Sequence, residues 1–335
     1  MEWVEFMTAW VRIAMLWSLG FAGALCGTSE LARAQQDPFS MHAPVPLLGR
    51  WDVTVKTADG EYPSWFEVHQ SGFRTLVGRY VGQFGSARPV SEFEFDGENV
   101  RFSVPPQWEH RTEPVVLEGR LEGDVIRGEL TDDQGGTLSW TAVRAPKMER
   151  AGEVVLGEPI ELFNGSDLAG WHAQFAGANN GWEAIDGVLT NARPGNNLIT
   201  DRKFTDFELS LEFRYPEGSN SGIYLRGRHE VQIEDNVGLE ADSHRIGGVY
   251  GFLTPSVNAA LPAGEWQRIT IRLVGRVVSV ELNGERIIDR QVIPGITGGA
   301  LDSHEGEPGP LMLQGDHGPV EYRAIVLREI SMVTE

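Results

Sequence analysis

The chain has 335 residues, which is long enough for two domains of ordinary size. Its 28 Lys and Arg residues stand against 48 Asp and Glu residues, and the resulting net charge of −20 argues against a nucleic acid or an anionic membrane surface as partner. With 40 glycines, 10 tryptophans and no long helical period, the composition favours an all-β protein with many tight turns.

Residues 1–34 predict a signal peptide. Arg12 precedes an apolar run over residues 13–26, and Ala32-Arg33-Ala34 offers an A-x-A cleavage site before Gln35. The run is too short for a membrane span, so we expect a periplasmic or secreted protein with no transmembrane segment after signal removal. Because the single cysteine, Cys26, lies in this segment, the mature chain has no disulfide and no thiol chemistry.

Residues 35–46 are polar and rich in proline, and they predict a linker. Residues 47–145 then alternate apolar and polar side chains in short runs, which predicts a small antiparallel β-barrel or sandwich. The expected strands cover residues 51–55, 66–69, 75–81, 93–95, 100–104, 115–119, 125–130 and 137–141. We interpret this part as an accessory domain because it contains no catalytic constellation, and we expect His69 and His110 to be ordinary surface residues.

A charged connector over residues 146–153 leads to a second β-rich part, residues 154–335. Asp186-Gly187 predicts a hairpin within residues 182–189, and a longer hairpin over residues 269–282 is expected to close on Asn283-Gly284. Further strands are expected over residues 207–215, 248–252, 264–267, 311–318 and 320–327. A dozen strands without a helical segment indicate two facing sheets, a jelly-roll sandwich.

The stretch from Pro216 to Asn236 carries the densest set of polar side chains. From Glu230 to Asp235 polar residues alternate with apolar ones, so Glu230, Gln232 and Glu234 project from one face of a strand. A solvated strand face also carries mixed charge, but carboxylate, amide and guanidinium groups on adjacent strands would suit a hydroxyl-rich ligand. We therefore expect the functional site here.

Several motifs occur in a fixed order through the second part of the chain. They are Leu162-Phe163-Asn164-Gly165, Asp167-Leu168, Gly170-Trp171, Asp186-Gly187-Val188-Leu189, Asp206-Phe207-Glu208-Leu209, Ser219-Asn220-Ser221-Gly222-Ile223, Glu230-Val231-Gln232-Ile233, Gly264-Glu265-Trp266 and Gln314 with His317-Gly318. Together they resemble the 3-keto-disaccharide hydrolase family over about residues 154–332. The resemblance implies a concanavalin A-like lectin/glucanase sandwich, and it does not extend to residues 47–143.

The resemblance also implies a chemistry: cleavage of glycosides or disaccharides whose sugar is oxidised to a ketone at C3. The ketone acidifies the proton on C2, so a base can remove it, the substituent at C1 is expelled, and water adds to the enone. Such a route needs a general base and a hydrogen-bonding or positive group at the ketone oxygen, with an acid for the leaving group.

Ordinary lectin-fold glucanases instead carry Glu-x-Asp-x-x-Glu on one strand, which supplies a retaining pair of carboxylates. The corresponding spacing here reads Glu230-x-Gln232-x-x-Asp235. The central amide cannot ionise, so we favour elimination and hydration over double displacement. A non-catalytic, lectin-like carbohydrate-binding protein remains the alternative from another class, because the fold does not decide between binding and catalysis.

We assign provisional roles on this basis. Glu230 is the first candidate for base or metal ligand, Asp235 competes with Glu234 as second carboxylate, and His317 is the histidine best suited to proton transfer. Expected substrate-binding residues are Arg226, Gln232, Asn220, Ser221, Tyr250 and Gln314, with Asn220 and Ser221 in a tight turn. His244 and His304 are weaker candidates.

A divalent metal ion is the one cofactor that these residue types suggest. Glu230, Asp235 and His317 would supply oxygen and nitrogen ligands, and the ion would act as a Lewis acid at the ketone. No compact metal-binding motif supports this hypothesis in the sequence. The sequence does not identify the sugar, the linkage, the anomer or the oligomeric state.

Overall fold

The computed structural model describes residues 45–132 and 135–333. The expected signal peptide and residues 35–44 of the expected linker lie outside the described residues. Every helix or strand assigned in the described ranges is a β-strand, which confirms the predicted all-β class. These ranges contain no helix with the length and apolar character that crossing a membrane would require.

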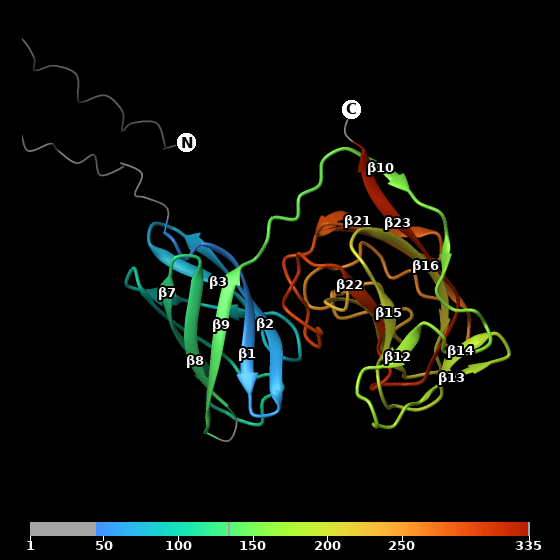
Figure 1. Cartoon of the computed structure of the whole chain (residues 1–335), viewed down its shortest axis with the longest axis horizontal. Helices are drawn as coiled ribbons and strands as arrows, with labels where there is room; N and C mark the ends of the chain where they lie inside the picture. The colour runs from blue at the N-terminus through green and yellow to red at the C-terminus, as the bar shows by residue number, and fades with distance from the viewer. Residues whose placement is uncertain (1–44, 133–134, 334–335) are drawn as a thin grey trace, which may run out of the picture. The chain divides into compact units, whose positions relative to one another are not determined.

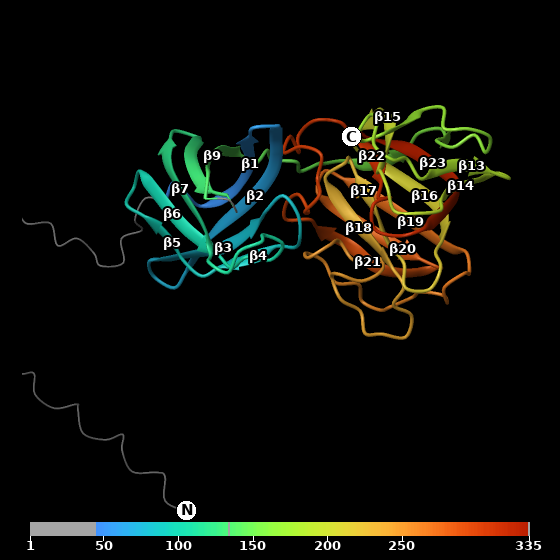
Figure 2. The ribbon, with the colours of Figure 1, turned by 90° about the horizontal axis from the view of Figure 1, so that it is seen from below.

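The first nine strands form one antiparallel sheet, called the N-terminal sheet, in the order β4-β3-β2-β1-β9-β8-β7-β6-β5. The strands are β1 (Gly49–Thr57), β2 (Gly60–Ser71), β3 (Thr75–Val81), β4 (Arg88–Val90), β5 (Phe93–Phe95), β6 (Asn99–Val104), β7 (Val115–Glu122), β8 (Val125–Thr131) and β9 (Thr137–Arg144). The sheet curls around a single core, to which Trp51, Phe66 and Trp140 contribute (Figure 2).

One of these strands, β4, is not predicted from the sequence. Its middle residue is Pro89, which has no backbone N–H to donate to a ladder. The strand lies at the end of the sheet, where it pairs only with β3, and an edge is where proline is tolerated. The other eight expected strands are present, most of them longer than predicted.

The remaining strands form two sheets, called the C-terminal sandwich (Figure 1). One sheet runs β13-β14-β23-β16-β19-β20-β21, with β10 and β11 also paired to β23, and the other runs β12-β15-β22-β17-β18. The strands are β10 (Glu153–Leu156), β11 (Ile160–Glu161), β12 (Trp171–Ala173), β13 (Trp182–Ile185), β14 (Val188–Asn191), β15 (Leu198–Phe204), β16 (Phe207–Arg214), β17 (Asn220–Leu225), β18 (His229–Glu234), β19 (Gln267–Val274), β20 (Val277–Leu282), β21 (Glu285–Val292), β22 (Gly309–Leu313) and β23 (Val320–Val333). One core lies between the two sheets, as predicted for a sandwich.

The turns of the sandwich follow the sequence signals only in part. Asp186-Gly187 joins β13 to β14 as predicted, with both residues at positive φ. The hairpin of β19 and β20 turns instead at Gly275-Arg276, and Asn283-Gly284 connects β20 to the following strand, β21. Residues 248–252 do not form a strand but make isolated bridges through Val249.

Residues from Val45 onward belong to one compact unit, in which the N-terminal sheet packs on the sandwich. Trp65 of β2 is fully buried, and its ring occupies the space where a side chain at position 295 would begin, so Gly295 is required there. Nearby, Thr54 and Ser303 share a hydrogen bond of 2.8 Å. The N-terminal sheet is therefore joined to the sandwich by a buried apolar contact and by a partly buried hydrogen bond.

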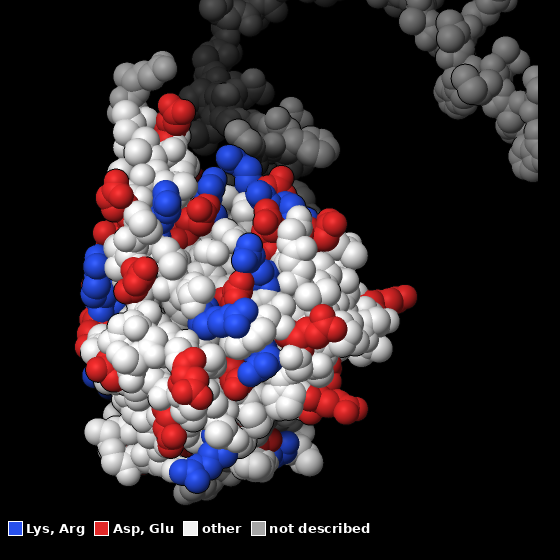
Figure 3. Space-filling model, turned by 90° about the vertical axis from the view of Figure 1, so that its right-hand side faces the viewer, with Lys and Arg blue, Asp and Glu red and all other residues white. Residues whose placement is uncertain are grey.

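Acidic and basic side chains are interspersed on the face drawn in Figure 3. Ion pairs of this kind cross the outer surface of the sandwich, where Glu212 accepts hydrogen bonds from Arg268 at 2.9 Å and Arg323 at 2.7 Å. Exposed pairs of this type contribute little to stability, roughly 0–1 kcal/mol each, and mainly keep opposite charges dispersed.

Candidate functional site

A cavity of about 220 Å³ opens over β17 and β18, on the side of these strands that faces away from the sandwich core. Ile223, Val231 and Ile233 point into that core and are fully buried. Their strand neighbours therefore point outward, as the period of two predicts. The cavity is lined by Phe84, Gly85, Gln174, Phe175, Asn197, Asn220, Tyr224, Glu230, Gln232, Tyr250, Gly298, Gly299, Gln314, Asp316 and His317.

Glu230 lies on the floor of this cavity with only 4% of its surface exposed. Tyr224 is its cross-strand partner on β17, and the Tyr224 hydroxyl lies 3.0 Å from Oε2 of Glu230. Gly222, also on β17, leaves room for the carboxylate, because a Cβ at that position would lie 2.3 Å from Oε1 of Glu230. The hairpin thus holds one carboxyl group in a fixed place.

Burial raises the pKa of Glu230 to about 8, since a charged carboxylate is poorly solvated in this cavity. The hydrogen bond from Tyr224 and the charge of His317 oppose this effect, and the charge of Asp316 adds to it. A carboxyl with such a pKa is a stronger base than an ordinary glutamate and exchanges protons near neutral pH.

The Tyr224 hydroxyl has one proton and two acceptors, Oε2 of Glu230 and the carbonyl oxygen of Gly298, each at 3.0 Å. When Glu230 is ionised, Tyr224 can donate to it. When Glu230 is protonated, its own proton can occupy that contact while Tyr224 donates to Gly298. The hydrogen bond between Tyr224 and Glu230 can therefore form in both protonation states of Glu230, as suits a residue that takes up and releases a proton.

Two amide side chains in the lining have a buried oxygen without a partner. Oε1 of Gln232 and Oε1 of Gln314 make no hydrogen bond to any described residue, although both side chains lie within the lining of the cavity. A ligand bound in the cavity would satisfy these acceptors if it supplied hydrogen-bond donors. Sugar hydroxyl groups are donors of the required kind.

His317 and Asp316, which also line the cavity, form an ion pair. Nδ1 of His317 lies 2.6 Å from Oδ1 of Asp316, and this hydrogen bond raises the pKa of His317, with partial burial opposing the shift. The charge of Glu230 raises it further. The cavity thus contains a carboxyl that holds a proton and an imidazole that favours its protonated form.

The structure gathers some of the expected site residues at this cavity and leaves others away from it. Glu230, Gln232, Asn220, Tyr250, Gln314 and His317 all line it. Asn220 and Ser221 both belong to β17 rather than to the predicted turn. Ser221 points into the core, where its hydroxyl donates to the carbonyl of Gln314 at 2.8 Å. Its place follows from strand alternation, since its neighbour Asn220 faces the cavity.

Arg226 and Asp235 lie outside the lining for different reasons. Arg226 is in the turn between β17 and β18, and its guanidinium donates to the carbonyl of Gly275 at 2.7 Å. Asp235 follows β18, and its carboxylate accepts the backbone N–H of Gly218 at 2.8 Å. The alternative carboxylate, Glu234, accepts a hydrogen bond from Asn236 at 3.0 Å and also lies outside the lining.

The expected metal ligands do not fit a common ion. Glu230 and His317 share the cavity, but Asp235 is absent from its lining. Among the described residues there is no group of three or more His, Cys, Asp or Glu side chains arranged to hold a metal.

The sequence reasoning missed Tyr224, Phe175, Asp316 and the loop that carries Phe84. The alternation of Ile223 and Tyr224, paired against Glu230 in a hairpin, is the signal that would have found Tyr224. Asp316 directly precedes the predicted His317 and could have been considered as its partner. Nothing in the sequence near Phe84 connects it with residues of the sandwich.

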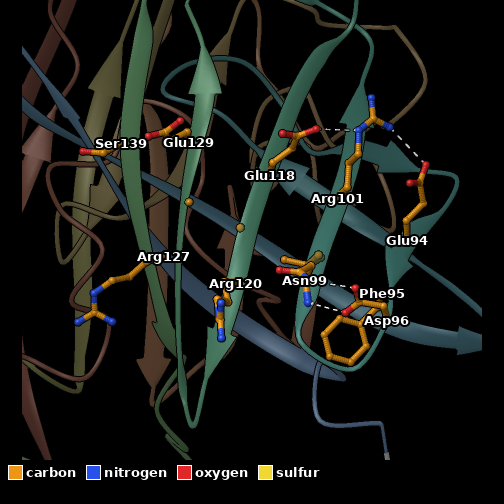
Figure 4. Close-up of a pocket in the computed structure, with 13 residues that line it drawn as sticks. Glu94, Phe95, Asp96, Asn99, Arg101, Glu118, Arg120, Arg127, Glu129 and Ser139 are labelled. Carbon is orange, nitrogen blue, oxygen red and sulfur yellow. Dashed lines mark hydrogen bonds and ion pairs between the residues drawn. The ribbon is translucent and has the colours of Figure 1, made fainter.

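A larger hollow of about 870 Å³ lies on the N-terminal sheet (Figure 4). It is an open sheet face on which Arg101 donates to Glu118 at 3.0 Å and to Glu94 at 3.3 Å. Asp96 is likewise occupied by hydrogen bonds from Asn99, which lower the pKa of Asp96 to about 2. Since every acidic side chain in this hollow is exposed, none has the burial that distinguishes Glu230.

Comparison with known proteins relates residues 158–328 to one family model, described as the 3-keto-alpha-glucoside-1,2-lyase-like domain, which spans half of the chain. A relative from Bacteroides thetaiotaomicron, named 3-keto-disaccharide hydrolase, is 25% identical over an alignment that covers 39% of this chain and 57% of the relative. The chain therefore spans little more than half the length of that relative.

Two crystal structures of proteins from Parabacteroides distasonis, each described as a "putative glycosyl hydrolase", are also similar. The first is 26% identical, with 55% of this chain and 94% of that chain aligned and a TM-score of 0.44. The second is 21% identical, with 52% and 94% aligned and a TM-score of 0.43.

Proposed function

The chain belongs to the family of 3-keto-α-glucoside-1,2-lyase-like domains, and from this premise we propose that it cleaves glycosides whose sugar carries a ketone at C3. The observation that carries the proposal is the buried carboxyl of Glu230 on the floor of a cavity whose lining also includes Gln232 and Gln314, each with a buried amide oxygen that has no partner. A base beside unsatisfied acceptors suits a hydroxylated substrate with an acidic C–H bond.

The proposed reaction begins at C2, whose proton is acidified by the adjacent ketone. Glu230 takes that proton, the electron pair forms a C1–C2 double bond, and the C1–oxygen bond to the leaving group breaks. The departing oxygen takes a proton from His317. Water then adds: its hydroxyl bonds to C1, its proton restores the imidazolium of His317, and Glu230 returns its proton to C2, so that the net change is hydrolysis of the glycoside.

The two titrating residues have environments suited to these roles. The pKa of Glu230, raised to about 8, favours proton uptake, and the raised pKa of His317 favours a protonated imidazole beside it. A base with a raised pKa beside a protonated imidazole supplies the two proton transfers that the reaction requires. Gln232 and Gln314 would accept hydrogen bonds from sugar hydroxyls and so orient the ring.

Ordinary retaining hydrolysis has less support. It requires two carboxylates on either side of the glycosidic bond, about 5–5.5 Å apart. Asp235 and Glu234, the expected partners of Glu230, lie outside the cavity lining and accept hydrogen bonds from Gly218 and Asn236. Asp316 does line the cavity, but its carboxylate is bound to His317.

The test compares a 3-keto-glucoside with its unoxidised parent, using purified protein, with and without a chelator, while release of the leaving group is followed. Turnover of the keto form alone, together with transient absorbance of an enone, is the expected result. Turnover of the parent sugar would establish an ordinary glycosidase instead. Binding of either sugar without turnover would indicate a lectin-like protein.

A further inference from the structure

The cavity over Glu230 is too small for a whole disaccharide. Its volume of about 220 Å³ lies below the roughly 300–1,000 Å³ of pockets that enclose drug-sized ligands, so it has room for about one sugar ring. If the reacting ring lies against Glu230, which is 4% exposed, the second ring must extend to the rim. The rim is therefore where the leaving group would be recognised.

Two large apolar side chains stand at this rim. Phe84 is 49% exposed and belongs to the loop between β3 and β4 of the N-terminal sheet, and Phe175 is 61% exposed in the segment after β12. Single exposed aromatic residues are ordinary on protein surfaces. Here, however, two of them come from separate parts of the chain and line the same, otherwise polar cavity.

The loop that carries Phe84 is fixed against the sandwich by backbone contacts. The N–H of Gly299 donates to the carbonyl of Gln83 at 2.8 Å. At Gly298 a Cβ would lie 2.2 Å from the carbonyl oxygen of Gly85, so this close approach requires glycine. The same Gly298 carbonyl accepts from Tyr224, which places the loop next to the hydrogen-bond network of Glu230.

The ring of Phe84 also packs against a second aromatic side chain. Trp108 meets it edge to face, with ring centroids 5.3 Å apart and an interplanar angle of 82°. The N–H of Ser86 donates to Oε1 of Gln107 at 3.0 Å, which ties the loop to the segment that carries Trp108. A preorganised ring loses little freedom when a ligand binds to it.

We propose that Phe84 and Phe175 form an apolar platform for the ring of the leaving group, so that the N-terminal sheet takes part in substrate selection. The apolar C–H face of a pyranose would pack on the aromatic rings, while its hydroxyls remain hydrated. The identity of the reacting ring in this inference rests on the proposed function. The platform itself rests on the geometry of the rim.

The test measures kcat/KM of Phe84→Ala with two substrates, a 3-keto-disaccharide and the methyl 3-keto-glucoside, which lacks a second ring. We expect a loss on the order of tenfold with the disaccharide, mainly in KM, and no change with the methyl glycoside. Phe84→Trp should retain activity because it keeps a flat ring. Phe73→Ala serves as the control, since Phe73 is 67% exposed in the turn between β2 and β3 of the same sheet and lies outside the cavity lining.

Calorimetric binding of the unoxidised disaccharide and of glucose separates this inference from the proposed function. If no keto sugar is turned over but Phe84→Ala weakens binding of the disaccharide and not of glucose, the platform stands and the proposed chemistry fails. If keto sugars are turned over and Phe84→Ala affects both substrates equally, the platform is overturned. Phe84→Leu, which keeps the apolar volume without the flat ring, decides the question if the alanine variant does not fold.

Discussion

Tyr224 and Glu230 face each other across the β17–β18 hairpin, with the phenolic oxygen 3.0 Å from the carboxylate. Burial of both side chains raises the pKa of each, and the negative charge of Glu230 adds to the effect on Tyr224, whose pKa lies well above its ordinary value. Tyr224 therefore stays protonated and acts as a hydrogen-bond donor. Because this hydrogen bond holds the carboxylate of Glu230, Tyr224 is a positioning residue for the proposed base.

Tyr224→Phe tests this relationship. The hydrogen bond from Tyr224 lowers the pKa of Glu230, so its loss should raise that pKa further and leave less ionised base at neutral pH. We expect kcat/KM for the keto sugar to fall roughly tenfold at pH 7, in line with the loss of a hydrogen bond to a charged group. The acidic limb of the pH–rate profile should move to higher pH. An unchanged limb would show that Tyr224 does not act on the base.

Glu230→Gln should lower the turnover rate roughly 10²–10⁴-fold, because the amide cannot accept the C2 proton. The variant should also be more stable near neutral pH. The pKa of Glu230 rises from 4.5 unfolded to about 8 folded, so the folded state resists its ionisation and loses stability as pH rises between these values. Glutamine has no such dependence.

The matched control for this variant is Glu234→Gln, four residues along the same strand. Glu234 accepts a hydrogen bond from Asn236 and lies outside the cavity lining, so we expect turnover within twofold to threefold (roughly) of the wild type, as for a surface change. Activity assays and urea unfolding from pH 5 to about pH 9 check both variants. Equal losses in the two would remove Glu230 from its proposed role.

Gly222→Ala should disturb the same carboxylate from the neighbouring strand. The added Cβ would lie 2.3 Å from Oε1 and 2.9 Å from Cγ of Glu230, so the side chain must move. We expect a large loss of turnover and a destabilisation of about 1–3 kcal/mol, as for overpacking of a buried site. In a Glu230→Ala background the effect of Gly222→Ala on stability should largely disappear, and persistence there would place the clash elsewhere.

The alternation of residues 230–235 was enough to predict which side chains of β18 share a face, and Glu230 and Gln232 do line the cavity. The same rule, applied one strand earlier, would have turned Ser221 inward, since Asn220 faces the cavity and adjacent residues point to opposite faces. The sandwich fold itself followed from the spacing of strands and turns.

Other features depend on contacts between distant segments and leave no local signal. Phe84 reaches the site only because the loop after β3 docks on Gly298 and Gly299, more than two hundred residues later in the chain. The burial that raises the pKa of Glu230 depends on residues outside its own strand, among them Tyr224 and Gly222 of β17. The alternation of apolar and polar residues in a strand predicts which side chains share a face of the sheet, but it does not predict which segments of the chain cover that face.

A buried carboxyl outside the site should make stability depend on pH in a defined direction. Asp52 of β1 lies beside Glu305, and burial together with that negative charge raises its pKa to about 9, although Arg276 and Arg228 oppose the shift. Between about pH 4 and pH 9, Asp52 therefore keeps in the folded state a proton that it has released in the unfolded state. This contribution to the free energy of unfolding decreases as pH rises through that range.

Asp52→Asn removes this dependence, because asparagine does not titrate. Relative to the wild type, the variant should become progressively more stable from pH 5 to about pH 9 in urea unfolding experiments. Asp59→Asn, an exposed aspartate in the following turn, is the control and should track the wild type. A constant difference between Asp52→Asn and the wild type across this range would mean that Asp52 is already ionised in the folded protein.

His317 should matter in proportion to how much protonation the leaving group needs. If its imidazolium supplies the proton to the departing oxygen, His317→Ala should lower kcat/KM by roughly 10²-fold or more for a 3-keto-disaccharide. The loss should be small for a 3-keto p-nitrophenyl glycoside, whose leaving group departs as a stable anion. Asp316→Asn replaces the charged acceptor that raises the pKa of His317 with a neutral one, so the alkaline limb of the pH–rate profile should move to lower pH. His244→Ala is the control, because His244 contacts Tyr250 but lies outside the cavity lining. Equal losses with both leaving groups would contradict an acid role and make His317 a binding residue.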